Sequence, residues 1–461
     1  MNKRLRIFLG LLTLSFSSLG LANNTPQTFT LPNGLTVVVK QDKRAPVVMS
    51  QVWYHVGSSD EPNGLTGISH MLEHMMFKGT PNNPGNTFMT TIADNGGQLN
   101  AMTTRDFTAY YEALAKDKLP LSFELEADRM ANLSFENNDF DKERNVVREE
   151  RRLRTENVPR SLTYERFQAS AFIANPYHHP VVGWPDDIEN YTNKDVENWY
   201  RQWYTPNNAT VVVVGDVEPQ TVYKLAQQYF GKIPSRPLPE TKPHKAVEPL
   251  GTRRVAVERP AKLPFLLIGY NVPSLTTAND PSEAYTLEVI SGILDGGDSA
   301  RLQKELVRGK QVATEAGVGY DLYARYDDVF LLAGTPSQDH SVSQLQQALQ
   351  EQIKRLQTQP VSDAELERVK TQVIANKIYA QDSIQTQAQL IGTAMSAGIG
   401  LEELDNYVAN IQKVTPQQIQ QVAKTFFTPT RLTIGTLDPL PIGDSTTPTR
   451  TTPQQGEHHG Q

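Results

Sequence analysis

The sequence predicts an α+β protein made of two homologous half-chain domains, and three observations support this prediction. Strand and helix patterns alternate up to about residue 214, and the alternation begins again at about Arg253. The segment between them, residues 234–243, is rich in Pro and charged residues, as interdomain linkers are. The third observation is an internal repeat. A chain of 461 residues has room for two such domains.

The repeat relates residues 192–211 to residues 415–434 at a constant offset. Each stretch begins with a Thr that has Asp or Gln three residues later, which is the pattern of a helix N-terminus. A helix with an aromatic end, a Thr-Pro pair and a β-branched strand follow in both. Self-similarity of this kind indicates that the two halves are copies of one unit.

The elements of the first half, residues 23–235, follow from hydrophobic periodicity and turn signals. Pro-Asn-Gly at 32–34 predicts a hairpin turn between a strand at 27–31 and a strand at 35–40. We expect further strands at 47–56, 97–103, 107–112 and 211–214, and helices at 67–77, 87–94, 119–132 and 140–155. A linker at 236–252, a second domain at 253–438 and a disordered tail at 439–461 complete the chain.

The N-terminus has the pattern of a signal peptide. Lys3, Arg4 and Arg6 precede an apolar run at residues 7–21, and small residues end at Ala22. We expect cleavage after Ala22 and, in a Gram-negative source, a periplasmic or secreted product. A membrane anchor is the weaker alternative, because the run is short and contains Ser and Thr.

Composition excludes several classes of protein. The chain has no Cys, so disulfides, thiolate metal sites and Cys nucleophiles are excluded, and any zinc must bind to His, Asp or Glu. Removal of the three basic residues of the signal peptide takes the formal charge from −7 to −10, which argues against a nucleic-acid partner. No interior stretch is long enough to span a membrane, so we expect a chain that is not membrane-embedded.

The most informative motif is His-Met-Leu-Glu-His at residues 70–74. Apolar residues around it recur at helical spacing, which predicts a largely buried helix. His70 and His74 lie one turn apart on that helix and can hold one ion, and Glu73 lies on the same side. Three polar groups on a buried face need a partner, and a divalent cation supplies one. The alternative is two satisfied core histidines and a surface glutamate.

The second half lacks these groups. An offset nearly equal to that of the repeat aligns residues 68–74 with residues 290–296, where Gly292 and Gly296 replace the two His. The second copy can therefore keep the helix but not hold the ion. One half would be catalytic, and the other structural or substrate-binding.

The chain resembles the pitrilysin, insulinase and mitochondrial processing peptidase family of inverted zinc peptidases, in its short bacterial and mitochondrial subgroup. The resemblance covers essentially the whole mature chain and rests on residues 70–74, 77–80, 96–97, 100–103 and 143–150. It implies that each half is a mostly antiparallel sheet packed with helices, and that the halves form a clamshell-like pair.

The resemblance also implies one Zn²⁺ per chain and a third ligand from a distant helix. Glu149 and Glu150 are both candidates, and the family pattern selects Glu150 as the ligand and Glu143 as the residue that orients a ligand His. Helical geometry agrees, because Glu143, Val146, Val147 and Glu150 form one stripe. For Glu149 we favour the alternative, a solvated helix face with ion pairs.

The mechanism follows from these parts. Zinc lowers the pKa of bound water, and Glu73, which is next to His74 and therefore not a comfortable ligand, is placed to act as general base on that water. The resemblance implies that a substrate adds as a strand to the segment 97–103, with Asn100 and Ala101 beside the cleaved bond. The alternative for this segment is an ordinary β-strand.

The second half departs from the family pattern. Family members use an Arg and a Tyr there to bind substrate, and Arg301 fits the Arg. Thr314 occupies the position expected for Tyr, and Tyr320 comes six positions later. We therefore expect a heterodimer with a homologous chain that lacks the zinc motif, or a homodimer. The alternative for Arg301 is a surface ion pair.

These observations predict a zinc metalloendopeptidase that acts on peptides or unfolded polypeptides. An inactive scaffold or peptide-binding chain of the same fold is the alternative, and a metal carrier is a third possibility. His178 and His179 follow a turn, and we interpret them as structural or loop residues.

Overall fold

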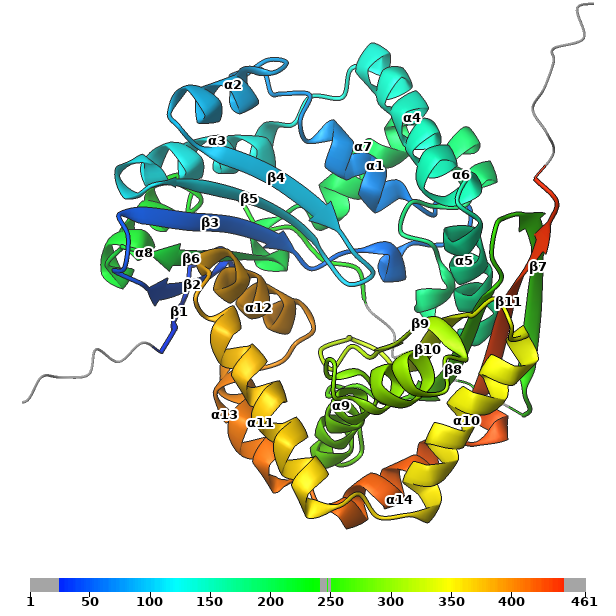
Figure 1. Ribbon diagram of the computed structural model, residues 1–461. Helices are drawn as coiled ribbons and strands as arrows, with labels where there is room; N and C mark the ends of the chain where they lie inside the picture. Colours follow the sequence, from blue (N-terminus) through cyan, green and yellow to red (C-terminus); the bar gives the residue numbers. More distant parts are fainter. Residues whose placement is uncertain (1–24, 241–246, 248–249, 443–461) are drawn as a thin grey trace, which may run out of the picture.

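The computed structural model describes residues 25–240, 247 and 250–442, which form two α/β halves that face each other (Figure 1). The predicted signal peptide, its expected cleavage site and most of the predicted tail lie outside these residues. The structure confirms the predicted α+β fold, with one mostly antiparallel sheet in each half. Within the described residues, no helix is long and apolar enough to cross a membrane.

Five strands have the same order in both sheets, and the first sheet has β1 as an additional edge strand. The first has the order β1-β2-β6-β3-β5-β4 and the second the order β7-β11-β8-β10-β9. In each sheet one pair is parallel, β2 with β6 and β7 with β11, and the other pairs are antiparallel. The strands are β1 (Gln27–Thr30), β2 (Thr36–Gln41), β3 (Val47–Tyr54), β4 (Gln98–Thr103), β5 (Thr108–Ala115), β6 (Ala209–Gly215), β7 (Arg253–Pro260), β8 (Phe265–Val272), β9 (Ala313–Gly319), β10 (Asp328–Pro336) and β11 (Leu432–Leu440).

Helices cover both faces of each sheet. The α-helices are α1 (Ile68–Met75), α2 (Thr87–Asp94), α3 (Leu119–Asn132), α4 (Asn137–Arg151), α5 (Pro159–Ala171), α6 (Pro185–Asn190), α7 (Asn193–Trp203), α8 (Pro219–Tyr229), α9 (Pro281–Asp295), α10 (Val342–Thr358), α11 (Asp363–Ala380), α12 (Ile384–Ser396), α13 (Leu401–Lys413) and α14 (Pro416–Phe426). The repeated capping boxes form at Thr192 and Thr415, where each Thr accepts a bond from the third residue of its helix, α7 or α14.

The halves exchange one helix each. Helix α12 from the second half packs on β6 and β3 of the first sheet, and α5 from the first half packs on β11, β7 and β8 of the second sheet (Figure 1). Gly392 of α12 lies against Trp53, so an added Cβ would be 1.9 Å from the indole ring. In the other contact the glycine is on the sheet and the aromatic side chain is on the helix: Phe167 of α5 lies against Gly269 of the second sheet. A large side chain opposite a glycine lets helix and sheet approach closely in both places.

The end of the second sheet corrects the predicted start of the tail. Strand β11 continues to Leu440 and pairs with β7 through Pro439 opposite Arg259 and Leu440 opposite Pro260. Residues 439 and 440 were expected in the disordered tail but belong to the sheet. These two residues show no hydrophobic periodicity, so the sequence did not predict a strand there. They are ordered because they pair with a strand about 180 residues earlier in the chain.

Candidate metal centre

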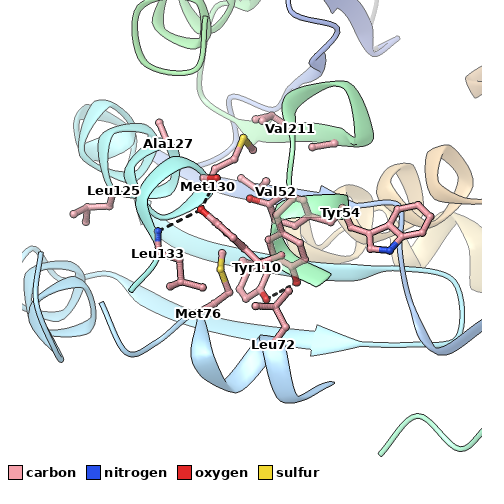
Figure 2. Packing of buried hydrophobic residues seen from close by; sticks show 14 of the residues in the cluster. Val52, Tyr54, Leu72, Met76, Tyr110, Leu125, Ala127, Met130, Leu133 and Val211 are labelled. Carbon is pink, nitrogen blue, oxygen red and sulfur yellow. Dashed lines mark hydrogen bonds between the residues drawn. The ribbon is translucent and has the colours of Figure 1, made fainter. Parts of the chain in front are cut away.

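Helix α1 carries the motif residues, and its apolar face fixes it in the core. Met71, Leu72 and Met75 are fully buried in the first half. Figure 2 shows Leu72 packed toward Tyr110 of the sheet. The opposite side of the helix presents His70, Glu73 and His74 to a cleft. The amphipathic pattern of the sequence therefore determines which way these three side chains point.

The N-terminus of α1 is capped from a distance. Gly67, the residue before the helix, has a φ of 83° and offers no side chain. The buried carboxylate of Glu61 takes that role, because it accepts bonds from the backbone N–H groups of Gly67 at 2.7 Å and Ser69 at 2.8 Å. Burial raises the pKa of Glu61 to about 8, and the hydrogen bonds from these two N–H groups oppose that rise. Sequence analysis missed Glu61, which lies in a loop without periodicity.

Three side chains converge between α1 and α4. Oε2 of Glu150 lies 3.6 Å from Nε2 of His70 and 3.4 Å from Nε2 of His74. Each of the three offers one ligand atom, and these atoms lie within 4.8 Å of one another. Among the residues that the structure describes, this is the one such group of three or more His, Asp and Glu.

The donor set fits zinc. A tetrahedral ion with ligand distances of about 2.0–2.2 Å separates its donors by about 3.3–3.6 Å. The distances of 3.4 and 3.6 Å from Glu150 to the two imidazoles match this spacing. Two His and one carboxylate, with a fourth position left for water or substrate, are typical of catalytic zinc.

The electrostatics of the two His differ. Burial lowers the pKa of His74, but hydrogen bonds and charges from Glu143 and Glu150 outweigh it and raise that pKa to about 9. Burial and the neighbouring His74 lower the pKa of His70 to about 4. A hydrogen bond from His74 lowers the pKa of Glu150 to about 2. Burial is the largest cause of the low pKa of His70, whereas hydrogen bonds to two carboxylates keep the pKa of His74 high.

That second carboxylate is Glu143. Its Oε2 lies 3.0 Å from Nδ1 of His74, and its Oε1 lies 2.5 Å from Nζ of Lys78. Lys78 thereby fixes Glu143 in place, a role that sequence analysis did not assign. By contrast, Nδ1 of His70 is buried and has no hydrogen-bond partner within the described part of the chain.

The predicted stripe on α4 is partly wrong. Glu143, Val147 and Glu150 do lie on the side that faces α1, and Val147 is fully buried. Val146, expected in the same stripe, is 48% exposed, because the buried face of α4 is narrower than the predicted stripe. Glu149 is exposed and pairs with Arg152 at 2.7 Å, as the solvated-face interpretation requires.

Glu73 lies beside the three candidate ligands and is not one of the group. Burial raises the pKa of its carboxyl, and a hydrogen bond donated by Thr103 Oγ1 opposes that rise. Thr103 ends β4, the edge strand of the first sheet. Asn100 and Ala101 of β4 line the cleft with Glu73, as expected. The Ala101 N–H donates to Asn100 Oδ1 at 2.8 Å.

Both halves of the chain line this cleft, which has a volume of about 960 Å³. The first half supplies the candidate ligands, β4 and part of α5. The second sheet supplies an apolar wall. Its residues are Phe265, Leu267, Leu331 and Ala333.

Two family models match adjacent parts of the chain. The model described as insulinase (peptidase family M16) matches residues 36–183, and the model described as peptidase M16 inactive domain matches residues 190–373. The zinc protease PqqE of Helicobacter pylori is 32% identical to this chain over 420 residues. The match covers 90% of this chain and 93% of PqqE. The chain belongs to peptidase family M16.

Solved structures agree with this assignment. A protease from Helicobacter pylori has a TM-score of 0.86 at 32% identity, and the match covers 90% of this chain and all of that chain. The periplasmic protease PqqL from Escherichia coli has a TM-score of 0.76 at 18% identity over 90% of this chain and 48% of that chain, a likeness that shows the fold alone. The chain is therefore a short, bacterial-type member of the family.

Arg301, which was expected to bind substrate from the second half, does not reach this cleft, and neither do Thr314 and Tyr320, the residues at and near the position expected for Tyr. Arg301 is 9% exposed and pairs with Glu365 through two hydrogen bonds of 2.9 and 2.7 Å. Tyr320 donates its hydroxyl to the carbonyl of Pro273 at 2.8 Å, and Thr314 donates to Thr335 O at 3.3 Å. None of the three lines the cleft at the metal centre. Arg301 is thus in an ion pair, and that pair is buried rather than on the surface.

His178 and His179 take part in loop contacts. Nδ1 of His178 lies 2.8 Å from the carbonyl of Asn175, and Nε2 of His179 lies 3.0 Å from Oδ1 of Asn63. Burial and the neighbouring His178 lower the pKa of His179 to about 4. Both side chains are separate from the metal centre.

Proposed function

We propose that this chain is a zinc metalloendopeptidase that hydrolyses peptides or unfolded polypeptides. One observation carries the proposal: the imidazoles of His70 and His74 and the carboxylate of Glu150 meet at zinc-ligand spacing, with Glu73 beside them. An inactive scaffold would have no need to keep three ligands and a buried base together. Membership of the family and the similarity to a named zinc protease support the same activity.

Each side chain has a defined task in this proposal. Zinc held by the three ligands would supply a Lewis acid that polarises the scissile carbonyl and makes water more acidic. Glu73 takes a proton from the attacking water and gives it to the leaving amine. The Thr103 hydroxyl holds one oxygen of Glu73, so that the other can face the cleft. Burial raises the pKa of Glu73, which makes its carboxylate a stronger base.

Substrate binding is proposed at β4. This strand is one edge of the first sheet, and its residues Asn100 and Ala101 lie in the cleft beside Glu73. An extended peptide can add to such an edge through backbone hydrogen bonds. A folded protein does not present a free strand, so the geometry favours short or unfolded chains.

The test measures metal and activity together. Purified protein should contain one zinc per chain and should cleave unfolded casein or fluorogenic peptides. A chelator should abolish cleavage, and added zinc should restore it. Zinc binding without hydrolysis, even with a partner chain present, would favour a metal carrier. No zinc and no hydrolysis would favour the scaffold.

We also propose that the chain works with a partner in the periplasm or outside the cell. The signal-peptide pattern of residues 1–22 supports the location. The partner is a homologous chain without the zinc motif, or a second copy. Arg301 is engaged by Glu365 within its own half, and a second copy would carry the same ion pair, so this observation favours the homologous chain as the source of the substrate-binding Arg and Tyr. Full activity of the isolated monomer would overturn the partner proposal.

A further inference from the structure

The relative position of α1 and α4 decides whether the metal centre exists. Two ligands belong to α1 and the third, Glu150, to the last turn of α4. Helix α4 ends one residue later, and a π-helical turn follows at Arg152–Glu156. Helix ends fray unless they are tied to other elements, so something must fix this end against α1.

Arg151, the residue after Glu150, provides such a tie. Its side chain is 2% exposed, and its guanidinium makes a two-pronged bond to Glu165 of α5, at 2.7 and 3.0 Å. It also donates to the carbonyl of Gly183 at 2.7 Å and to Glu156 at 3.1 Å. Four hydrogen bonds from a planar, buried guanidinium set both position and orientation.

The hydrogen bond to Gly183 connects Arg151 to the start of α1. Gly183 and Gly67, the residue before α1, lie against each other, so a Cβ added to Gly67 would be 2.7 Å from the Cα of Gly183. A Cβ on Gly183 would in turn be 2.8 Å from the Cα of Gly67. No side chain fits between these two backbones. Glu61 holds the same end of α1 through the N–H groups of Gly67 and Ser69.

We infer that Arg151 is a positioning residue for the metal centre: through Gly183 and Gly67 it sets the distance between Glu150 and the two His of α1. This inference rests on the proposed zinc site. Arg151 also borders the cleft, but its guanidinium is buried and makes four hydrogen bonds within the protein, so it is not free to bind substrate. Its effect should therefore appear in metal binding without any substrate.

The experiment compares Arg151→Lys with Arg152→Lys, a matched control in which the neighbouring arginine is half exposed and forms its ion pair with the exposed Glu149. Zinc affinity is measured by competition with a chelator, and the visible absorption of bound Co²⁺ reports ligand geometry. We expect Arg151→Lys to lower zinc affinity about 10- to 100-fold and to change the Co²⁺ spectrum. Arg152→Lys should match the wild type in both.

Two results would overturn the inference. Wild-type affinity and spectrum in folded Arg151→Lys would show that Arg151 does not position the ligands. If that variant does not fold, Glu165→Gln replaces it, and wild-type zinc affinity in Glu165→Gln has the same meaning. Failure of the wild-type protein to bind zinc would instead overturn the proposed function.

Discussion

Oε2 of Glu143 lies 3.0 Å from Nδ1 of His74. This contact holds a proton on Nδ1 and leaves Nε2 to face Glu150 with its lone pair when the imidazole is neutral. A carboxylate behind a ligand His fixes the tautomer and ring orientation that a metal requires. Helix α4 therefore supplies both the third candidate ligand, Glu150, and the carboxylate that orients His74, Glu143.

Glu143→Gln should weaken zinc binding about 10- to 100-fold, because the amide orients His74 less strongly than a carboxylate. Chelator competition measures the change. Glu149→Gln is the matched control, since Glu149 lies on the same helix but is exposed. Equal affinities for the two variants would contradict the role of Glu143.

Glu73→Gln should remove hydrolysis and keep the metal. Loss of a general base typically lowers the rate about 10²- to 10⁴-fold, while the three ligands remain intact. Metal analysis and peptide cleavage of the same sample test both parts. His74→Ala should lose both zinc and activity. A Glu73→Gln protein that lost zinc would mean that Glu73 is a ligand.

Zinc binding should release about one proton per chain at pH 7. In the metal-free protein His74, with a pKa of about 9, is protonated at this pH. His70, with a pKa of about 4, and Glu150, with a pKa of about 2, have already lost their protons. A ligand His must be neutral, so affinity should rise about tenfold per pH unit up to about pH 9 and then level off.

Calorimetry in buffers of different ionisation enthalpy counts the released protons. Glu143→Gln provides the control, because without that carboxylate the pKa of His74 should fall and fewer protons should be released at pH 7. Zinc affinity that does not change between pH 6 and pH 8 would contradict the assignment of His74 as a protonated ligand.

Ala101→Pro should impair peptide binding at β4. The Ala101 N–H donates to the Asn100 side chain rather than to a neighbouring strand, so the sheet does not depend on this hydrogen bond. Pro at an edge strand is tolerated but removes a donor that a bound peptide would use. We expect a higher KM for extended peptides and unchanged zinc content. An unchanged KM would exclude this N–H from substrate pairing.

Gly392→Ala should destabilise the protein, because its new methyl group would lie 1.9 Å from the Trp53 ring. Overpacking of this kind costs about 1–3 kcal/mol of unfolding free energy. Urea unfolding measures the change. Gly251→Ala is the control, since a Cβ there meets nothing within 4 Å, and it should change stability by less than about 0.5 kcal/mol. Equal stability of the two variants would mean that α12 moves aside at no cost.

The sequence predicted which polar side chains converge at the candidate metal centre, and it did so for a local reason. His70 and His74 lie one helical turn apart, and Glu143 and Glu150 lie two turns apart, so each pair shares a helix face whatever the surrounding fold. The strands of the first half and helices α1 to α4 followed in the same way from periodicity, whereas α5, α6 and α8 were not predicted. What periodicity could not give was the partner of each side chain, such as Lys78 for Glu143 or Thr103 for Glu73.

By itself, the sequence determined the two related halves, the helix that carries His-Met-Leu-Glu-His and the face that its polar groups share, because these depend on spacing along the chain. Only the tertiary structure decided that α5 and α12 cross to the opposite halves, that β11 extends to Leu440 and that Arg301 pairs with Glu365 away from the cleft. Those outcomes depend on contacts between residues far apart in sequence, where burial, close packing and charge pairing select one arrangement among many that the local pattern permits.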